Sequence, residues 1–96
     1  MTNRSISILA KMMIKNKDKK VKYAKQIIEI EYNKIIAQTR NFIKVCNTEK
    51  IANDILEFKN SEELFEYLYN LSVVDISLLS SYGIDVAFMN LLKVSD

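Results

Sequence analysis

Residues 18–46, DKKVKYAKQIIEIEYNKIIAQTRNFIKVC, form the longest periodic segment of the chain. Apolar and small side chains recur every three or four residues along it, which is the spacing of one helix face. The inner stripe consists of Val21, Ala24, Ile28, Ile35, Phe42 and Cys46, with Tyr32 and Thr39 beside it. This segment therefore predicts one long amphipathic helix, with Asp18 as its N-cap, that packs against several neighbours.

Shorter helical patterns lie on both sides of this long segment. The expected ranges are 5–15 before it and 49–58, 61–71, 73–82 and 86–94 after it. Asn60 with Glu63, and Ser72 with Asp75, have the spacing of a capping box, in which a side chain accepts a hydrogen bond from a backbone N–H group three residues later. Two of these short helices therefore have well-defined predicted starts.

The turn residues favour an all-α fold. The 96 residues include no proline and one glycine, Gly83, and the Asn-Gly and Asp-Gly dipeptides of tight β-hairpins are missing. Gly83 suits the left-handed position that ends a helix, and Asp85 is expected to cap the helix that follows. We expect residues 1–96 to form a single all-α domain, a compact bundle of five to six helices built around one long central helix.

Composition argues against several classes of protein. The chain has no histidine and one cysteine, Cys46, so a disulfide framework, the usual zinc sites and histidine-based acid–base chemistry are all disfavoured. Cys46 lies on the inner stripe and is expected to be a buried structural thiol. We expect no enzymatic activity, no cofactor and no metal.

The apolar segments predict where the chain resides. No apolar run is long enough to span a bilayer, and Lys11 interrupts the apolar residues near the N-terminus. No signal-peptide cleavage pattern follows that segment. We therefore expect a cytoplasmic protein without a membrane partner.

Charge is divided unevenly between the two halves of the sequence. Residues 1–50 carry a net charge of +8, and residues 51–96 carry a net charge of −6. A polar stripe of the long helix, together with Lys15 before it, supplies cations that we expect to contact nucleic-acid backbone: Lys15, Lys19, Lys22, Lys25, Arg40 and Lys44. The alternatives are an ordinary solvated face, pairing with the protein's own acidic half, or an acidic protein partner.

Two features of the acidic half are candidate binding surfaces. The last predicted helix is apolar nearly all round, so its residues belong either to the core or to a protein interface. The candidate interface residues are Val86, Phe88, Met89 and Leu92. The acidic residues Glu62, Glu63 and Glu66 are interpreted as a solvated face, because no calcium or phosphate loop accompanies them.

These observations lead to two functional hypotheses. The first is a non-enzymatic small subunit or adaptor, which docks into a larger assembly through its apolar, acidic C-terminal half. Such a subunit, of a ribonucleoprotein for example, would contact nucleic-acid backbone non-specifically with the cationic stripe. The alternative is a phage- or plasmid-encoded inhibitor or immunity-type protein that acts purely by binding a protein target. Self-association of basic end to acidic end is a third expectation, as a homo-oligomer sensitive to salt.

Overall fold

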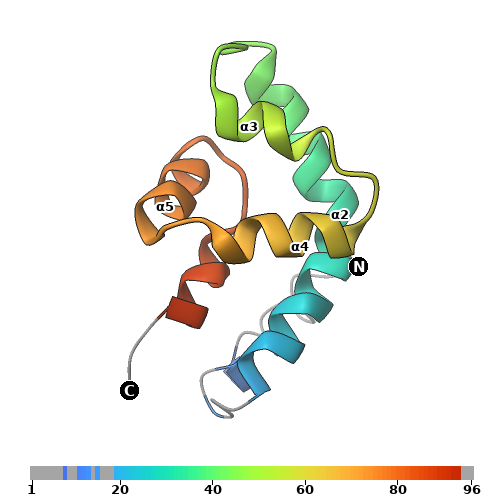
Figure 1. The fold of residues 1–96 in the computed structure, drawn as a ribbon, viewed down its shortest axis with the longest axis vertical. Coiled ribbons are helices and arrows are strands. Elements are labelled where there is room, and N and C mark those ends of the chain that lie inside the picture. The colour runs from blue at the N-terminus through green and yellow to red at the C-terminus, as the bar shows by residue number, and fades with distance from the viewer. Residues whose placement is uncertain (1–7, 9–10, 14, 16–18, 94–96) are drawn as a thin grey trace.

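The computed structural model describes residues 8, 11–13, 15 and 19–93, and all the regular elements in this part of the chain are helical. Figure 1 shows these elements joined by short turns. They are the α-helices α2 (Lys20–Ile43), α3 (Lys50–Ile55), α4 (Ser61–Asn70) and α5 (Val73–Ser81), followed by the 3-10 helix η2 (Ala87–Lys93). The predicted all-α class, with one long helix, is confirmed. Of the first predicted helix, residues 8, 11–13 and 15 are described and are helical, whereas Asp18 lies outside the described residues.

Helix α2 is the element against which the others pack. α3, α4 and η2 all contact it, and α4 crosses it in Figure 1. Its buried side chains are Ala24, Ile27, Ile28, Ile35, Ile36 and Thr39. The hydroxyl group of Thr39 donates to the carbonyl oxygen of Ile35 at 2.7 Å, so this buried polar group is satisfied within the helix.

The ends of the predicted inner stripe depart from expectation. Val21 is 44% exposed, because the buried part of α2 begins only at Ala24. Cys46 is half-buried rather than buried, since α2 ends at Ile43 and Cys46 lies in the following turn. The helical periodicity therefore identified the middle of the stripe correctly and was wrong at its two ends.

One hydrophobic core joins all the helices. Besides the residues of α2, it contains Met13, Ile55, Leu64, Phe65, Leu68, Ile76, Leu79, Ile84, Val86 and Met89. Every short helix after α2 contributes at least one fully buried side chain, as does the Gly83–Val86 connection. Burial against α2 is therefore what holds these short elements in place.

Both predicted N-cap hydrogen bonds are present. The side-chain oxygen of Asn60 accepts a hydrogen bond from the N–H group of Glu63 at 2.9 Å, and the Glu63 carboxylate accepts one from the N–H group of Lys59 at 3.1 Å. The hydroxyl oxygen of Ser72 accepts from the N–H group of Asp75 at 3.1 Å. These bonds satisfy helix N–H groups that have no partner inside the helix, so they fix where α4 and α5 begin.

Gly83 ends α5 as predicted. Its φ angle is +88°, in the left-handed region that favours glycine. The N–H group of Ile84 donates to the carbonyl oxygen of Leu79 at 3.2 Å, and that of Gly83 donates to Ser80 at 3.0 Å. This pair of bonds is the Schellman arrangement, and it turns the chain so that Ile84 enters the core.

The segment after Gly83 differs from expectation. The final helix is of the 3-10 type, and Asp85 does not cap it. Instead, the Asp85 carboxylate accepts hydrogen bonds from Gln38 at 2.9 Å and from Lys34 at 3.1 Å, while its N–H group donates to Gln38. These three contacts tie Asp85 to α2, and in the contact with Lys34 both partners are charged.

A second carboxylate, Asp54 at the end of α3, is anchored in the same way. It accepts hydrogen bonds from Lys50 at 3.0 Å and from the Tyr67 hydroxyl group at 2.8 Å. The Lys50 bond and then the Tyr67 bond lower the pKa of Asp54. The bond from Gln38 and then that from Lys34 lower the pKa of Asp85. Both acids therefore stabilise the fold in their ionised form.

Replacing Gly83 with alanine is expected to destabilise the protein by about 1 kcal/mol, because a side chain is strained at positive φ. No atom lies within 4 Å of the added methyl group, so the cost is one of backbone conformation and not of crowding. Urea denaturation measures this loss. Gly83→Asn is the matched control and should lose less, because asparagine tolerates the left-handed region. Equal losses in the two variants would contradict the assignment of Gly83 to the left-handed position that ends α5.

Acidification is expected to remove the contribution of Asp85 to the free energy of unfolding. A lowered folded-state pKa stabilises the protein above the unfolded pKa of about 3.9, and this stabilisation disappears as pH falls through the folded pKa. Wild-type protein should therefore be more stable than Asp85→Asn at neutral pH, and the difference should shrink below about pH 4. Urea denaturation across this range measures the difference. A difference independent of pH would contradict the pairing of Asp85 with α2.

Candidate nucleic-acid interface

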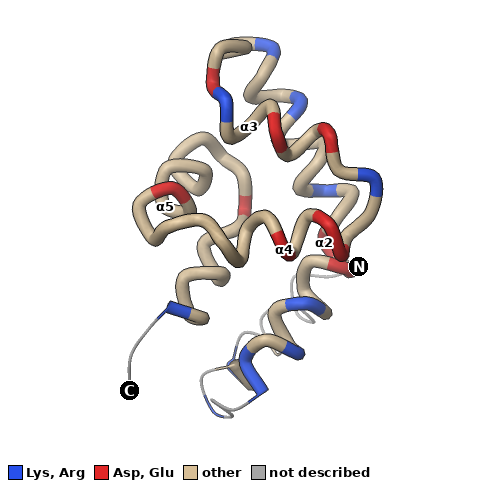
Figure 2. The backbone as a smooth tube through the Cα atoms, viewed as in Figure 1, with Lys and Arg blue, Asp and Glu red and all other residues tan. Residues whose placement is uncertain are grey.

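The cations predicted to contact nucleic acid are all on the surface. Lys15, Lys19, Lys22, Lys25, Arg40 and Lys44 are exposed. They form two groups along the chain. Lys15 and Lys19 precede α2 and Lys22 and Lys25 lie in its first turns, whereas Arg40 and Lys44 lie at its C-terminal end; Figure 2 shows basic residues at both ends of this helix. We call the first group, Lys15, Lys19, Lys22 and Lys25, the basic face. About 22 Å of helix, at about 1.5 Å per residue, separates Lys25 from Arg40, and the exposed Glu29 lies between them.

Among the described residues, ion pairs are formed by Lys34 and Lys50. Lys34 forms ion pairs with Glu31 at 3.0 Å and with Asp85 at 3.1 Å, and Lys50 forms one with Asp54 at 3.0 Å. Within the described part of the chain, no carboxylate lies within 4 Å of the nitrogens of the six predicted contact residues. In the part of the chain that the structure describes, no ion pair joins these six cations to the acidic half, a property that they share with Lys11, Lys20, Lys59 and Lys93.

Lys25 makes one contact inside the molecule. Its ammonium group lies 5.7 Å from the centre of the Phe65 ring, where a cation is attracted to the face of an aromatic ring. This contact positions the C-terminal end of the basic face beside α4. An ammonium group held on a ring keeps its positive charge, so Lys25 is both oriented and free to attract an anion.

The predicted protein interface at the C-terminal end divides into two pairs. Val86 and Met89 have no exposed surface and belong to the core, so the core alternative holds for these two residues. Phe88 and Leu92 are half-buried and pack against the same core. The sequence could not separate these pairs, because the whole segment is apolar.

An apolar surface that the sequence did not single out lies on α5. Val73, Val74 and Leu78 are exposed, Val74 to 74%. Helix α5 is apolar on most of its circumference, and it buries Ile76 and Leu79 on its inner side. The sequence signal was the apolar run of 71–79, interrupted only by Ser72, Asp75 and Ser77, which indicates a helix with apolar residues on both sides.

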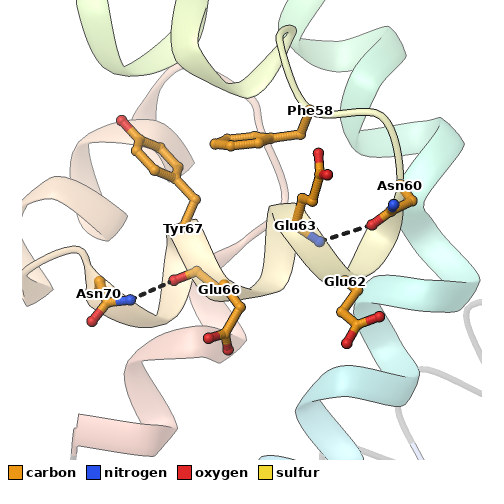
Figure 3. Close-up of a pocket in the computed structure, with 7 residues that line it drawn as sticks. All are labelled: Phe58, Asn60, Glu62, Glu63, Glu66, Tyr67 and Asn70. Atoms are coloured by element: carbon orange, nitrogen blue, oxygen red, sulfur yellow. Dashed lines mark hydrogen bonds between the residues drawn. The ribbon is translucent and has the colours of Figure 1, made fainter.

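A shallow groove of about 660 Å³ runs along the outer side of α4 (Figure 3). We call it the acidic groove, and its lining residues are Phe58, Asn60, Glu62, Glu63, Glu66, Tyr67 and Asn70. The rings of Phe58 and Tyr67 lie 5.0 Å apart at 45° and form its apolar wall. The three glutamates predicted as a solvated face are exposed. In Figure 3, Glu63 points to the same side of α4 as the two rings, whereas Glu62 and Glu66 point to the other side.

A second groove, of about 490 Å³, lies between the end of α2 and the end of α5. The rings of Phe42 and Tyr82 stack in it with centres 4.0 Å apart, and the Tyr82 hydroxyl group donates to the Glu49 carboxylate at 2.9 Å. That bond raises the pKa of Tyr82. Cys46 lines this groove and has one sulfur contact, to the Thr48 hydroxyl oxygen at 3.8 Å.

The described residues contain neither a metal-binding cluster nor a membrane-spanning helix. No group of three or more histidine, cysteine, aspartate or glutamate residues is placed to hold a metal ion in residues 8, 11–13, 15 and 19–93. Over the same residues, no helix is both long enough and apolar enough to cross a membrane.

Comparison with known proteins found no match: no family model, no curated protein and no solved structure is similar to the chain.

Replacing Met89 with alanine is expected to reduce the free energy of unfolding by about 2–5 kcal/mol, because its fully buried side chain would leave a cavity. Val74→Ala is the matched control, since Val74 is mostly exposed and its loss should change stability by less than about 0.5 kcal/mol. Urea denaturation of both variants measures the two losses. Equal losses would contradict the placement of Met89 in the core.

Proposed function

We propose that the protein is a non-catalytic helical module that binds nucleic-acid backbone without sequence specificity, and that it does so mainly through its basic face. The observation that carries this proposal is the density of exposed cations in one short segment. Lys15, Lys19, Lys22 and Lys25 are all exposed within residues 15–25, and none of them has an acid within ion-pair distance among the described residues. Unpaired cations on a rigid helix favour association with phosphates.

The residue types of the basic face favour backbone contact over base recognition. Lysine is a compact charge on a flexible stem, and it binds a phosphate as a point charge without the two-pronged geometry of arginine. The spacing of Lys19, Lys22 and Lys25 places one cation about every 4.5 Å along α2, close enough to engage successive phosphates. Arg40 and Lys44 would extend this contact for a ligand long enough to reach the far end of α2.

The same proposal includes docking of the module onto a protein. The exposed Val73, Val74 and Leu78 of α5 support this part, because exposed apolar patches of soluble proteins often mark interaction sites. An inhibitor or immunity-type protein would use this apolar surface without any nucleic acid. Nucleic-acid binding by the isolated chain is therefore what separates the two functions.

The proposal predicts micromolar binding of a labelled random single strand or duplex at about 50 mM salt, falling steeply at about 200 mM, as measured by fluorescence anisotropy. In the double variant Lys19→Gln with Lys22→Gln, the logarithm of the association constant should fall less steeply with the logarithm of the salt concentration. The magnitude of the slope should decrease by about 0.7–0.9 for each lost phosphate contact. The variant Arg40→Gln with Lys44→Gln should weaken binding less, because that group has only two cations.

The matched control is Lys50→Gln with Lys59→Gln, which removes the same net charge from outside both groups of cations. This control should retain most of the affinity. No binding at the lower salt concentration would overturn the proposal. An equal loss in the control and in the variant at positions 19 and 22 would show that net charge, and not the basic face, determines affinity.

A further inference from the structure

The acidic groove has the chemistry of a lysine-binding surface. Phe58 and Tyr67 provide an apolar wall on which the carbon stem of a lysine can pack, and cations are attracted to aromatic rings. The carboxylate of Glu63 already accepts a hydrogen bond from Lys59 N–H. In the described part of the chain, the carboxylates of Glu62 and Glu66 make no hydrogen bond or ion pair, so both are free to receive ammonium groups.

The chain itself carries a surface that complements this groove. Along α2, Lys19 and Lys25 are six residues apart, or about 9 Å. Along α4, Glu62 and Glu66 are four residues apart, or about 6 Å. Two helices packed side by side would therefore bring both carboxylates within the reach of flexible lysine side chains. Unpaired cations and unpaired carboxylates on one molecule provide the two halves of a contact between copies.

The two surfaces also adjoin on the molecule. Lys25 lies over Phe65, and Phe65 is next to Glu66 and three residues from Glu62 on α4. In Figure 3, Glu62 and Glu66 point to the same side of α4, the side on which the N-terminal half of α2 is drawn. A two-fold axis between two copies would then place each basic face against the partner's acidic groove, so both contacts would form at once.

From these observations we infer that the acidic groove binds the basic face of a second copy of this chain, giving a salt-sensitive two-fold dimer. Lys22 lies between Lys19 and Lys25, and Glu66 lines the acidic groove on the side of α4 opposite the two rings, so these two residues represent the contact. The inference goes beyond the proposed function and uses the same lysines. Nucleic acid and a second copy therefore compete for one surface.

Charge reversal tests the contact directly by sedimentation velocity. Wild-type protein at high concentration should sediment as a dimer at about 50 mM salt and as a monomer at about 300 mM salt, because exposed charges are screened over less than 10 Å at the higher salt. Glu66→Lys and Lys22→Glu should each be monomeric alone, since each variant opposes like charges. An equimolar mixture of the two should recover the dimer, because both contacts then join opposite charges again.

The matched control is Glu57→Lys, an exposed carboxylate outside the groove whose reversal changes the net charge equally. This variant should dimerise like wild-type protein, and circular dichroism should show unchanged helicity in every variant. A wild-type protein that is monomeric at low salt, or a mixture that stays monomeric, would overturn the inference.

Nucleic-acid binding separates this inference from the proposed function. Glu66→Lys should still bind the labelled strand, whereas Lys22→Glu should lose affinity for it. A dimer without any nucleic-acid binding would leave the inference standing and overturn the proposed function. Nucleic-acid binding by a protein that forms no dimer would overturn the inference and leave the proposed function standing.

Discussion

The burial of one face of α2 is the constraint on which the rest of the structure depends. The other α-helices have six to ten residues, and isolated helices of that length are unstable in water. They persist because side chains such as Ile55, Leu68 and Ile76 are removed from water in a core that they share with Ile28 and Ile35. Cys46 is free, so in the described part of this 96-residue chain the shared core is not supplemented by a disulfide.

This constraint also determines where charge lies. A helix with one apolar face in the core must present polar residues on the other, so the lysines of α2 are exposed because of the packing that makes the fold. The acids of α4 are exposed for the same reason, since Leu64, Phe65 and Leu68 face the core. The two charged surfaces adjoin because α4 packs across α2.

The features that the sequence predicted well are local ones. The caps at Asn60 and Ser72 and the left-handed turn at Gly83 depend on residues within five positions of one another, so their spacing was enough. The role of Asp85 depends on Gln38, which is 47 positions away, and no local pattern predicts that pairing. The same limit applies to the apolar segments 71–79 and 86–94, because only tertiary packing decides that Met89 is covered and Val74 is not.

The unpaired lysines connect the two proposed binding activities. If one surface serves both ligands, each must weaken the other by the same factor, because linkage between binding equilibria is reciprocal. Salt cannot separate the two activities, since it screens both contacts. Variants at the two ends of α2 can separate them, because Arg40 lies about 22 Å and Lys44 about 28 Å from Lys25, and both lie outside the acidic groove. A dimer would therefore retain a weaker cationic surface at the far end of each α2, through which nucleic acid can begin to bind before it displaces the second copy.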